Sequence, residues 1–321
     1  MKRLDSLRIR AGFTIIELLV VIGILGILLA ALLPMVGSSR DSALTAKCKN
    51  NMKNLAMGVL SCAQGNDEYG HFPAAGYYRS IEAKSRKKSY YPHRSWISNK
   101  GDIPMLNRST GSVYLGEVAH FTDSEDDVRN AVTNGAIWHA AGASFEIYRC
   151  PVHAREYEKQ NGGRQPGWSF MMNQEFGFNR DGVGSIGFFG ASIKSAITVS
   201  TETNGKRNDK TNAQRGHDKV LLFAEIQCAE VNDTKHGVSL KPAAGGTETD
   251  AVLEYTKENM GFNHKIGKTR YGGNVAFADG HVDMIMMPTA GGYIRDLTRY
   301  LCQGFAVPHD GSSYTPSNIE K

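Results

Sequence analysis

Histidine and carboxylate side chains gather in the last third of the chain, where they could bind a metal ion or exchange protons. The group comprises His217, Asp218, Glu225, His264, Asp279, His281 and Asp283. Their spacing matches no zinc-finger or EF-hand pattern. Calcium is the better metal hypothesis, because hard cations prefer carboxylate and carbonyl oxygens, and its candidate ligands are Asp279, Asp283 and His264. The simpler interpretation places Asp279 in a turn, with His281 and Asp283 on the exposed face of a strand.

No standard catalytic constellation accompanies these residues. The chain lacks the nucleophile elbow, the H-E-x-x-H motif and the C-x-x-C motif. Residues 261–269 resemble a phosphate-binding loop, but five residues separate the two glycines where four are required. The sequence therefore predicts neither an enzyme nor a nucleotide-binding protein, and it predicts no cofactor besides the calcium ion considered above.

A second group of side chains could bind an anionic polymer. Residues 79–100 are strongly basic and interleaved with aromatic residues, Trp96 among them. The candidate binding residues are Arg86, Lys87, Lys88, Tyr90 and Tyr91. Such a mixture can contact phosphate or carboxylate groups and stack on rings. The simpler interpretation is a solvated loop, since the net charge is only +5 and the acidic stretch 123–127 could neutralise it. Nucleic acid is therefore not the expected partner.

The first forty residues contain the segment that is expected to anchor the rest of the chain, a soluble head, in a membrane. Residues 18–36 are uncharged, and Glu17 is the only charged side chain between Phe13 and Val36. Such a run makes a helix that can cross a bilayer core of about 30 Å at about 1.5 Å per residue. The apolar core of a secretory signal peptide is usually shorter, roughly 7 to 15 residues. Four basic residues against one acidic residue in 1–12 predict a cytoplasmic N-terminus and an external head.

A specific motif surrounds the start of this run. Gly12 is followed by Phe-Thr-Ile-Ile-Glu-Leu-Leu-Val-Val-Ile-Gly-Ile-Leu. This stretch resembles the type IV prepilins and the pseudopilins of type II secretion systems. The resemblance implies that a prepilin peptidase cleaves after Gly12 and that the new terminal residue, Phe13, is methylated. It also implies assembly with other pilin or pseudopilin subunits at an inner-membrane platform.

Two residues inside the apolar run are interpreted as assembly residues. A carboxylate in an apolar span is costly unless it has a partner, and the resemblance implies that Glu17 pairs with the methylated amine of a neighbouring subunit. The alternative is that Glu17 lies close enough to the headgroups to stay hydrated. Pro34 also matches a family position, and it should bend or locally unwind the helix because it lacks an N–H group.

The helix is expected to continue beyond the membrane to about residue 64. Apolar residues recur there at helical spacing, at Leu44, Cys48, Met52, Leu55, Val59 and Cys62. This stripe must lie against the head. Cys48 and Cys62 would stand ~21 Å apart on one helix, too far for a disulfide, so both are interpreted as small core residues. A bridge among Cys150, Cys228 and Cys302 is left open.

The head is expected to combine strands with few helices. Strands are predicted at 145–149, 220–225, 274–278 and 281–286, and a helix at 293–301. The last two strands flank Asp279-Gly280, a strong signal for a hairpin turn. The predicted fold class is α+β and pilin-like, with a long N-terminal membrane-spanning helix packed on an antiparallel β-sheet head.

Several head segments resemble a bacterial prepilin subfamily whose domain of unknown function carries an H-x9-DG signature. The matching pieces are Cys48-x-x-Asn51-x-x-Asn54-Leu55, Tyr69-Gly70-x-Phe72-Pro73, Tyr148-Arg149-Cys150-Pro151, Leu221-Leu222-Phe223-Ala224-Glu225 and Asn274-Val275-Ala276-Phe277-Ala278-Asp279-Gly280-His281-Val282. The chain departs from the signature at one point. Fourteen residues, not nine, separate His264 from Asp279-Gly280, which indicates an insertion around 268–272.

The sequence thus predicts four segments. They are a leader peptide at 1–12, a transmembrane part of the helix at 13–36, its amphipathic continuation at 37–66 and a soluble head at 67–321. The predicted function is a structural subunit of a type IV pilus-like or type II secretion pseudopilus filament, held in the bacterial inner membrane with a periplasmic or extracellular head. The alternative is a membrane-anchored surface protein whose head binds glycan or another anionic polymer.

Overall fold

A computed structural model gives the fold of the 321-residue chain. It describes residues 14–66, 70, 72–73, 75, 95–98, 105–106, 113–114, 124–173, 176, 192–203, 206–227, 231–233, 238–240, 251–253, 259–266, 270–288 and 294–304. Side chains are described in these ranges except at 31–39, 66, 105–106, 113–114, 198–203, 206–213, 231–233, 238–240 and 295–296. The chain divides into two compact units, Met1–Ala43 and Leu44–Lys321.

The long helix α1 (Ile15–Asn66) begins with a capping box. Thr14 Oγ1 accepts a hydrogen bond from the backbone N–H of Glu17 at 3.3 Å. In return, the Glu17 carboxylate accepts one from the backbone N–H of Thr14 at 2.8 Å. These bonds satisfy two N–H groups at the start of the helix, which would otherwise lack partners. The helix confirms the predicted element and continues without a break past Pro34.

The described side chains of the first unit form an apolar surface. Every residue from 14 to 30 is exposed, including Ile15 at 84% and Ile27 at 73%. Large exposed apolar patches are rare on soluble monomers and usually mark a contact with protein or lipid. The first unit therefore presents a surface that this unit does not cover with its own residues.

The second unit contains the rest of α1, and there the apolar stripe predicted from the sequence is buried. Cys48, Met52, Leu55 and Val59 are fully buried in the head core, and Leu44 and Cys62 pack against it in part. Full burial of a Leu or Met side chain contributes about 2 kcal/mol. Gly58 lies so close to Ala141 that an added Cβ would stand 2.8 Å from the Ala141 Cβ. The stripe thus locks this part of α1 to the head.

A six-stranded sheet forms the centre of the head. Its strands are β3 (Phe170–Asn173), β6 (Leu221–Glu225), β9 (Val252–Leu253), β10 (His264–Ile266), β11 (Arg270–Phe277) and β12 (Val282–Met286). The order is β10-β11-β6-β3-β9, and β12 also pairs with β11. The pair β3–β9 is parallel, whereas the other pairs are antiparallel. The sheet is therefore mixed, which corrects the expectation of a purely antiparallel one.

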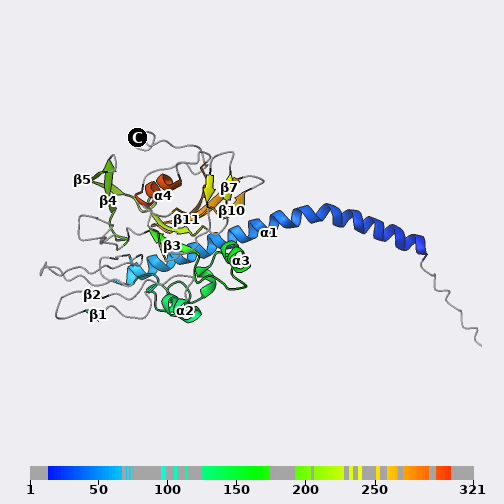
Figure 1. Cartoon of the computed structure of the whole chain (residues 1–321), viewed down its shortest axis with the longest axis horizontal. Helices are drawn as coiled ribbons and strands as arrows, with labels where there is room; N and C mark the ends of the chain where they lie inside the picture. The colour runs from blue at the N-terminus through cyan, green and yellow to red at the C-terminus, as the bar shows by residue number, and fades with distance from the viewer. Residues whose placement is uncertain are drawn as a thin grey trace, which may run out of the picture. The chain divides into compact units, whose positions relative to one another are not determined.

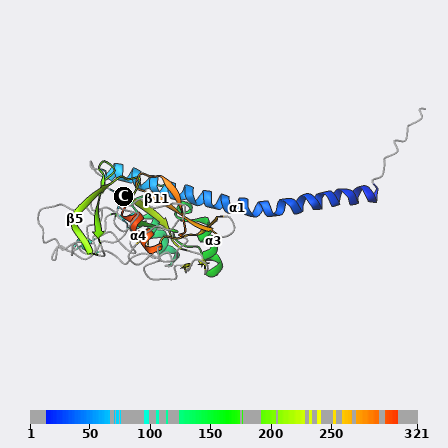
Figure 2. The ribbon, with the colours of Figure 1, turned by 90° about the horizontal axis from the view of Figure 1, so that it is seen from above.

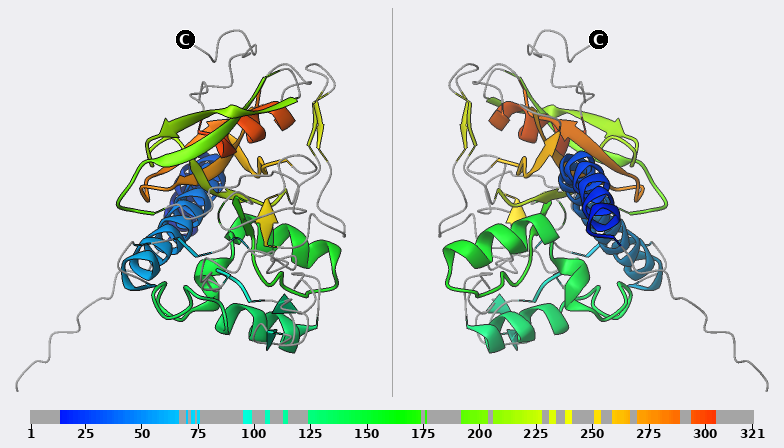
Figure 3. Two further views of the ribbon diagram at one scale, coloured as in Figure 1. Left: turned by 90° about the vertical axis from the view of Figure 1, so that its left-hand side faces the viewer. Right: turned by 90° about the vertical axis from the view of Figure 1, so that its right-hand side faces the viewer.

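Strand β11 has neighbours along both edges. Gly272 pairs with both β10 and β12, and Val275 pairs with both β6 and β12. Because β12 occupies one edge of β11, strands β10 and β6 must share the other. Within the second unit, Figures 1 and 3 show the part of α1 that begins at Leu44 and α4 (Ile294–Cys302) on opposite sides of this sheet, and Figure 2 shows that part of α1 next to β11.

The C-terminal expectations are confirmed and one earlier expectation is wrong. Strands β11 and β12 form the predicted hairpin, with Gly280 at φ 88° in its turn, and α4 is the predicted helix. Residues 145–149, expected as a strand, instead form the short 3-10 helix η1 (Phe145–Tyr148). Phe145 and Tyr148 both contact the Trp138 ring, and residues three apart share a face in a 3-10 helix. A short alternating pattern does not distinguish this arrangement from a strand.

The remaining elements surround the sheet and α1. They are α2 (Glu125–Thr133), α3 (Pro151–Gln160) and three two-stranded pairs, β1 (Met105–Leu106) with β2 (Val113–Tyr114), β4 (Ile197–Thr203) with β5 (Lys206–Arg215), and β7 (Val231–Asp233) with β8 (Val238–Leu240). Helix α3 begins at Pro151, a residue suited to the first helical position because it needs no N–H partner. Its N-cap, Cys150, is fully buried in the core.

Candidate functional site

Four chemically reactive side chains converge inside the head. Cys48 comes from α1, Cys150 from the N-cap of α3, Glu225 from the end of β6 and His264 from the start of β10. Each offers one atom, a sulfur, a carboxylate oxygen or a ring nitrogen, and these four atoms lie within 4.8 Å of one another. All four residues are buried. We call this set the Cys-Glu-His cluster.

The sheet register explains how Glu225 and His264 meet. Strands β6 and β10 share one edge of β11, where Ala224 pairs with Val275 and His264 pairs with Gly272. The ends of the two strands therefore approach each other beside Asn274, which lies between those two positions. The Asn274 amide nitrogen stands 2.8 Å from Glu225 Oε1 and 2.9 Å from His264 Nε2.

The two cysteines are brought together by Asn51, one turn beyond Cys48 on α1. Its amide nitrogen donates hydrogen bonds of 2.8 Å to the backbone carbonyls of Glu146 and Arg149. These carbonyls belong to the segment that leads directly into Cys150. Because Asn51 is nearly fully buried, both bonds form away from water, where each is strengthened by the low dielectric.

The Glu225 carboxylate is surrounded by donors. Its Oε1 atom lies 2.9 Å from Cys48 Sγ, 2.8 Å from His264 Nε2 and 2.8 Å from the Asn274 amide nitrogen. Its other oxygen, Oε2, accepts a hydrogen bond of 3.2 Å from the Asn263 amide. A buried carboxylate is tolerated only with such partners. Oε2 is therefore fixed by the protein while Oε1 faces the cluster.

The His264 ring is oriented by a contact on its far side. Its Nδ1 atom lies 3.0 Å from Thr45 Oγ1, so a proton on Nδ1 can be donated to the hydroxyl. Nε2 then faces Glu225 Oε1, the Asn274 amide and, at 3.8 Å, Cys150 Sγ. No single proton position suits these neighbours. A protonated Nε2 opposes the Asn274 N–H group, and an unprotonated Nε2 opposes the carboxylate lone pairs.

The cluster shifts the titration of its members. Burial raises the pKa of the Cys48 thiol, and the adjacent Cys150 and Glu225 raise it further. Burial would also raise the pKa of Cys150, but contacts with Cys48 and His264 lower it to about 7. The Glu225 charge raises the pKa of His264 to about 10 against the opposing effect of burial. Without a cation, the cluster therefore favours the anionic form of Cys150 but the protonated forms of Cys48 and His264.

The structure separates the three residues proposed as calcium ligands. His264 belongs to the Cys-Glu-His cluster, whereas Asp279 and Asp283 lie beside His281, with Asp279 Oδ1 2.5 Å from His281 Nδ1 and Asp283 Oδ2 3.8 Å from Nε2. His264 pairs with Gly272, and at about 3.3 Å per residue the end of β11 is far from that point. The three side chains therefore do not form one site.

The other predicted site residues can be placed only in part. Gly12, Phe13 and the basic set at 86–91 lie outside the described residues. Trp96, one of the aromatic residues interleaved with the basic segment 79–100, is fully buried, and its Nε1 donates to the Ala251 carbonyl. Among the described residues, Cys48, Cys62, Cys150 and Cys302 form no disulfide, and Cys228 lies outside the described residues.

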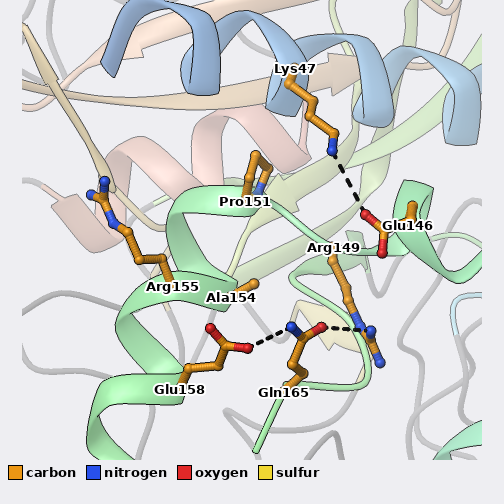
Figure 4. A pocket seen from close by; sticks show the side chains of 8 residues that line it. All are labelled: Lys47, Glu146, Arg149, Pro151, Ala154, Arg155, Glu158 and Gln165. Atoms are coloured by element: carbon orange, nitrogen blue, oxygen red, sulfur yellow. Dashed lines mark hydrogen bonds and ion pairs between the residues drawn. The ribbon is translucent and has the colours of Figure 1, made fainter. Parts of the chain in front are cut away.

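A shallow cavity of about 200 Å³ lies next to the N-terminus of α3, and Figure 4 shows its lining. Its side chains largely pair with one another. Lys47 faces Glu146 at 3.7 Å, Gln165 donates to Glu158 at 2.6 Å, and Arg149 donates to Gln165. The cavity offers less convergent chemistry than the Cys-Glu-His cluster, whose member Cys150 immediately precedes the lining residue Pro151.

Sequence reasoning missed the cluster although it had named its members. Cys48 was interpreted as a core residue, and Glu225 and His264 were assigned to a broad group with no metal spacing. A signal was present, because the segments that carried the head resemblance end in or contain Cys48, Cys150, Glu225 and Asn274. Four separate segments without local spacing cannot be assembled into a site before their strand pairing is known.

Comparison with known proteins adds one match. Residues 7–33 match the family described as the prokaryotic N-terminal methylation motif. This match supports a type IV prepilin-like or pseudopilin-like protein, as the sequence predicted. No curated protein and no solved structure matches the chain. Within the ranges that the structure describes, no helix combines the length and apolar content needed to cross a membrane.

Proposed function

We propose that this chain is a structural subunit of a type IV pilus-like or pseudopilus filament, made as a precursor and anchored in the bacterial inner membrane. A prepilin peptidase removes residues 1–12 and methylates Phe13. The processed chain then joins other subunits at an inner-membrane assembly platform. The observation that carries this proposal is the match of residues 7–33 to the N-terminal methylation motif.

The surface of the first unit supports this function. Its described side chains from 14 to 30 are exposed and apolar apart from Thr14, Glu17 and two glycines. Burying apolar area yields about 25 cal/mol per Å², so such a surface is stable only against lipid or other apolar helices. A subunit that passes from membrane to filament supplies both surroundings in turn.

Glu17 supports assembly through its position. It is the single charged residue among the described positions 14–30. Within the chain, the described hydrogen bonds of its carboxylate both come from Thr14, three residues away. A neighbouring subunit's terminal amine offers a stronger partner, because an ion pair in apolar surroundings is little screened. We therefore assign Glu17 to subunit register and Pro34 to bending of the helix during assembly.

Processing gives the first test. The full chain is expressed with an active prepilin peptidase, and the membrane fraction is analysed by mass spectrometry. The expected product begins at Phe13 and is heavier than the cleaved chain by one methyl group. A Gly12→Val chain should remain uncleaved. An uncleaved wild-type chain, beside a peptidase that cleaves a known substrate in the same cells, would refute the processing step.

Assembly gives the second test. Glu17→Ala should reduce the chain's recovery in the sheared filament fraction at least tenfold while its amount in membranes is unchanged. The matched control is Asp41→Ala, which removes another exposed carboxylate from the same helix. If Glu17→Ala enters filaments as well as wild type, the assigned role of Glu17 is wrong.

The alternative function, binding of an anionic glycan by the head, has no comparable support. Its candidate residues at 86–91 lie outside the described part of the chain. The aromatic residue of that segment that is described, Trp96, is buried against Phe223 and Tyr148 and cannot stack on a ligand. The structural subunit is therefore the function we propose.

A further inference from the structure

We propose that the head contains a structural metal site of the zinc class, in which Cys48 Sγ, Cys150 Sγ, His264 Nε2 and Glu225 Oε1 are the four ligands. The four atoms come from four different elements, and all lie within 4.8 Å of one another. The site would join α1, α3, β6 and β10 at one point inside the core.

The distances fit a tetrahedral ion after small adjustments. In a tetrahedral zinc site with Zn–S and Zn–N or Zn–O bonds of about 2.3 and 2.0 Å, neighbouring ligand atoms stand roughly 3.3 to 3.8 Å apart. Here Cys150 Sγ and His264 Nε2 are 3.8 Å apart, Cys48 Sγ and Glu225 Oε1 are 2.9 Å apart, and His264 Nε2 and Glu225 Oε1 are 2.8 Å apart. The two shorter contacts must lengthen by about half an ångström, and any pair wider than about 3.8 Å, up to the 4.8 Å limit of the set, must shorten.

The hydrogen-bonding contacts of His264 also favour a bound cation. His264 Nε2 lies within 2.9 Å of both an amide N–H group and a carboxylate oxygen. The Asn274 Oδ1 atom is buried and has no hydrogen-bond partner. A cation at the centre removes the conflict, because it accepts lone pairs from nitrogen, oxygen and sulfur together. Binding M²⁺ would release the two thiol protons and the Nε2 proton.

The surrounding groups match those that support metal ligands. Ligating histidines usually donate their second ring N–H to a protein acceptor, which fixes the tautomer. Thr45 Oγ1 stands in that position beside His264 Nδ1, and Asn263 holds the second carboxylate oxygen of Glu225. Two thiolates, an imidazole and a carboxylate carry one negative charge more than a divalent ion. The amide donors of Asn263 and Asn274 face that charge.

The ligand chemistry selects the metal and its role. Thiolate and imidazole ligands favour zinc over calcium or magnesium, which prefer oxygen alone. Four protein ligands leave no open position for water or substrate, so the site is structural rather than catalytic. Because every ligand is buried, the ion would enter as the head folds.

The full-length chain, purified in detergent without chelator, tests the site by elemental analysis. About one zinc ion per chain is expected, with loss of at least 80% in Cys48→Ser and Cys150→Ser. Cys62→Ser is the matched control, since Cys62 lies on the same helix but contacts the Ala136 carbonyl instead. Chelation should lower the Tm of the head by roughly 5 to 10 °C.

A second measurement does not depend on the folding of variants. The wild-type chain is reduced, stripped of metal and titrated with Co²⁺, which gives thiolate-to-cobalt charge-transfer absorption when sulfur coordinates. Absence of both zinc and this absorption would overturn the proposal. So would zinc that persists in both cysteine variants, or a disulfide-linked Cys48–Cys150 peptide in the isolated protein. A metal-free chain that gains the cobalt absorption supports the site.

Discussion

The two glutamates of interest show how differently the two units use a carboxylate. Glu17 is exposed, lies among apolar side chains, and bonds within its own turn to Thr14. Glu225 is fully buried and contacts four residues distant in sequence, Cys48, Asn263, His264 and Asn274. The first carboxylate is thus suited to a partner supplied from outside the chain. The second is already part of a network that holds the head together.

The largest expected difference between them concerns stability of the head. Glu225→Ala removes the carboxylate whose charge raises the pKa of His264. Removing one partner of a buried ion pair costs about 3–5 kcal/mol. The free energy of unfolding should fall by that amount in denaturant titrations of the full chain in detergent. Tryptophan fluorescence reports this transition, since Trp96, Trp138 and Trp168 all lie in the second unit.

Glu17→Ala is the matched control for that measurement. Its unfolding free energy should stay within about 0.5 kcal/mol of wild type, because an exposed side chain outside the head adds little to head stability. Equal losses in the two variants would break the comparison between the units.

The next effect concerns pH. Burial lowers the pKa of His153 on α3 from 6.5 to about 4, although the Glu225 charge opposes the shift. Above pH 6.5 the ring is neutral in both states and contributes nothing. Between pH 6.5 and 4 the unfolded chain binds a proton that the folded chain does not. The free energy of unfolding should therefore decrease by about 1 to 3 kcal/mol as the pH is lowered through this range. His153→Gln should reduce this slope in denaturant titrations at pH 4 to 7, and an unchanged slope would contradict the burial of a neutral ring.

A smaller effect compares two glycines of α1. Alanine in a helix is favoured over glycine by about 1 kcal/mol, but the Cβ of Gly58→Ala would meet Ala141 atoms at 2.8 to 3.2 Å. This steric overlap should outweigh the gain in helix propensity, so the free energy of unfolding of the head should fall by about 1 kcal/mol. Gly26→Ala, with nothing within 4 Å of the added Cβ, should leave the thermal midpoint of the head unchanged. A stabilised Gly58→Ala head would show that α1 and Ala141 are not in close contact.

The smallest effect is confined to the start of α1. Thr14→Ala removes the hydroxyl that accepts the Glu17 N–H, and loss of a capping group costs about 0.5–1 kcal/mol of local helix stability. Hydrogen exchange should accelerate in the first turn only, with an unchanged head transition. Acceleration that extends into residues 44–66 would mean that the two parts of α1 unfold together.

The sequence predicted those features that depend on neighbours in the chain. The length of α1, its buried stripe, the hairpin at Gly280 and α4 all follow from periodicity or turn chemistry. The strand prediction at 145–149 is wrong because a segment of five residues fits two periods equally well. The N-terminal motif was likewise recognisable, since its residues are contiguous.

The Cys-Glu-His cluster could not be predicted in the same way. Its members are separated by up to 216 residues, from Cys48 to His264. Their meeting depends on β6 and β10 sharing one edge of β11, a pairing that no local pattern encodes. The candidate calcium ligands are separated for the same reason, because that set groups His264 with Asp279 and Asp283, which are near in sequence but lie elsewhere on the sheet.

The continuity of α1 has a mechanical consequence. Tension applied to one end of a helix travels along its axis, and here that axis runs unbroken from Ile15 to Asn66. The first side chain of the second unit to be fully buried along this path is Cys48, with Asn51 one turn later. A pulling force would therefore reach the Cys-Glu-His cluster at Cys48 before it reaches the fully buried stripe residues Met52, Leu55 and Val59, and it would load the four elements of the cluster. Their joint resistance would set the force at which the head releases its helix.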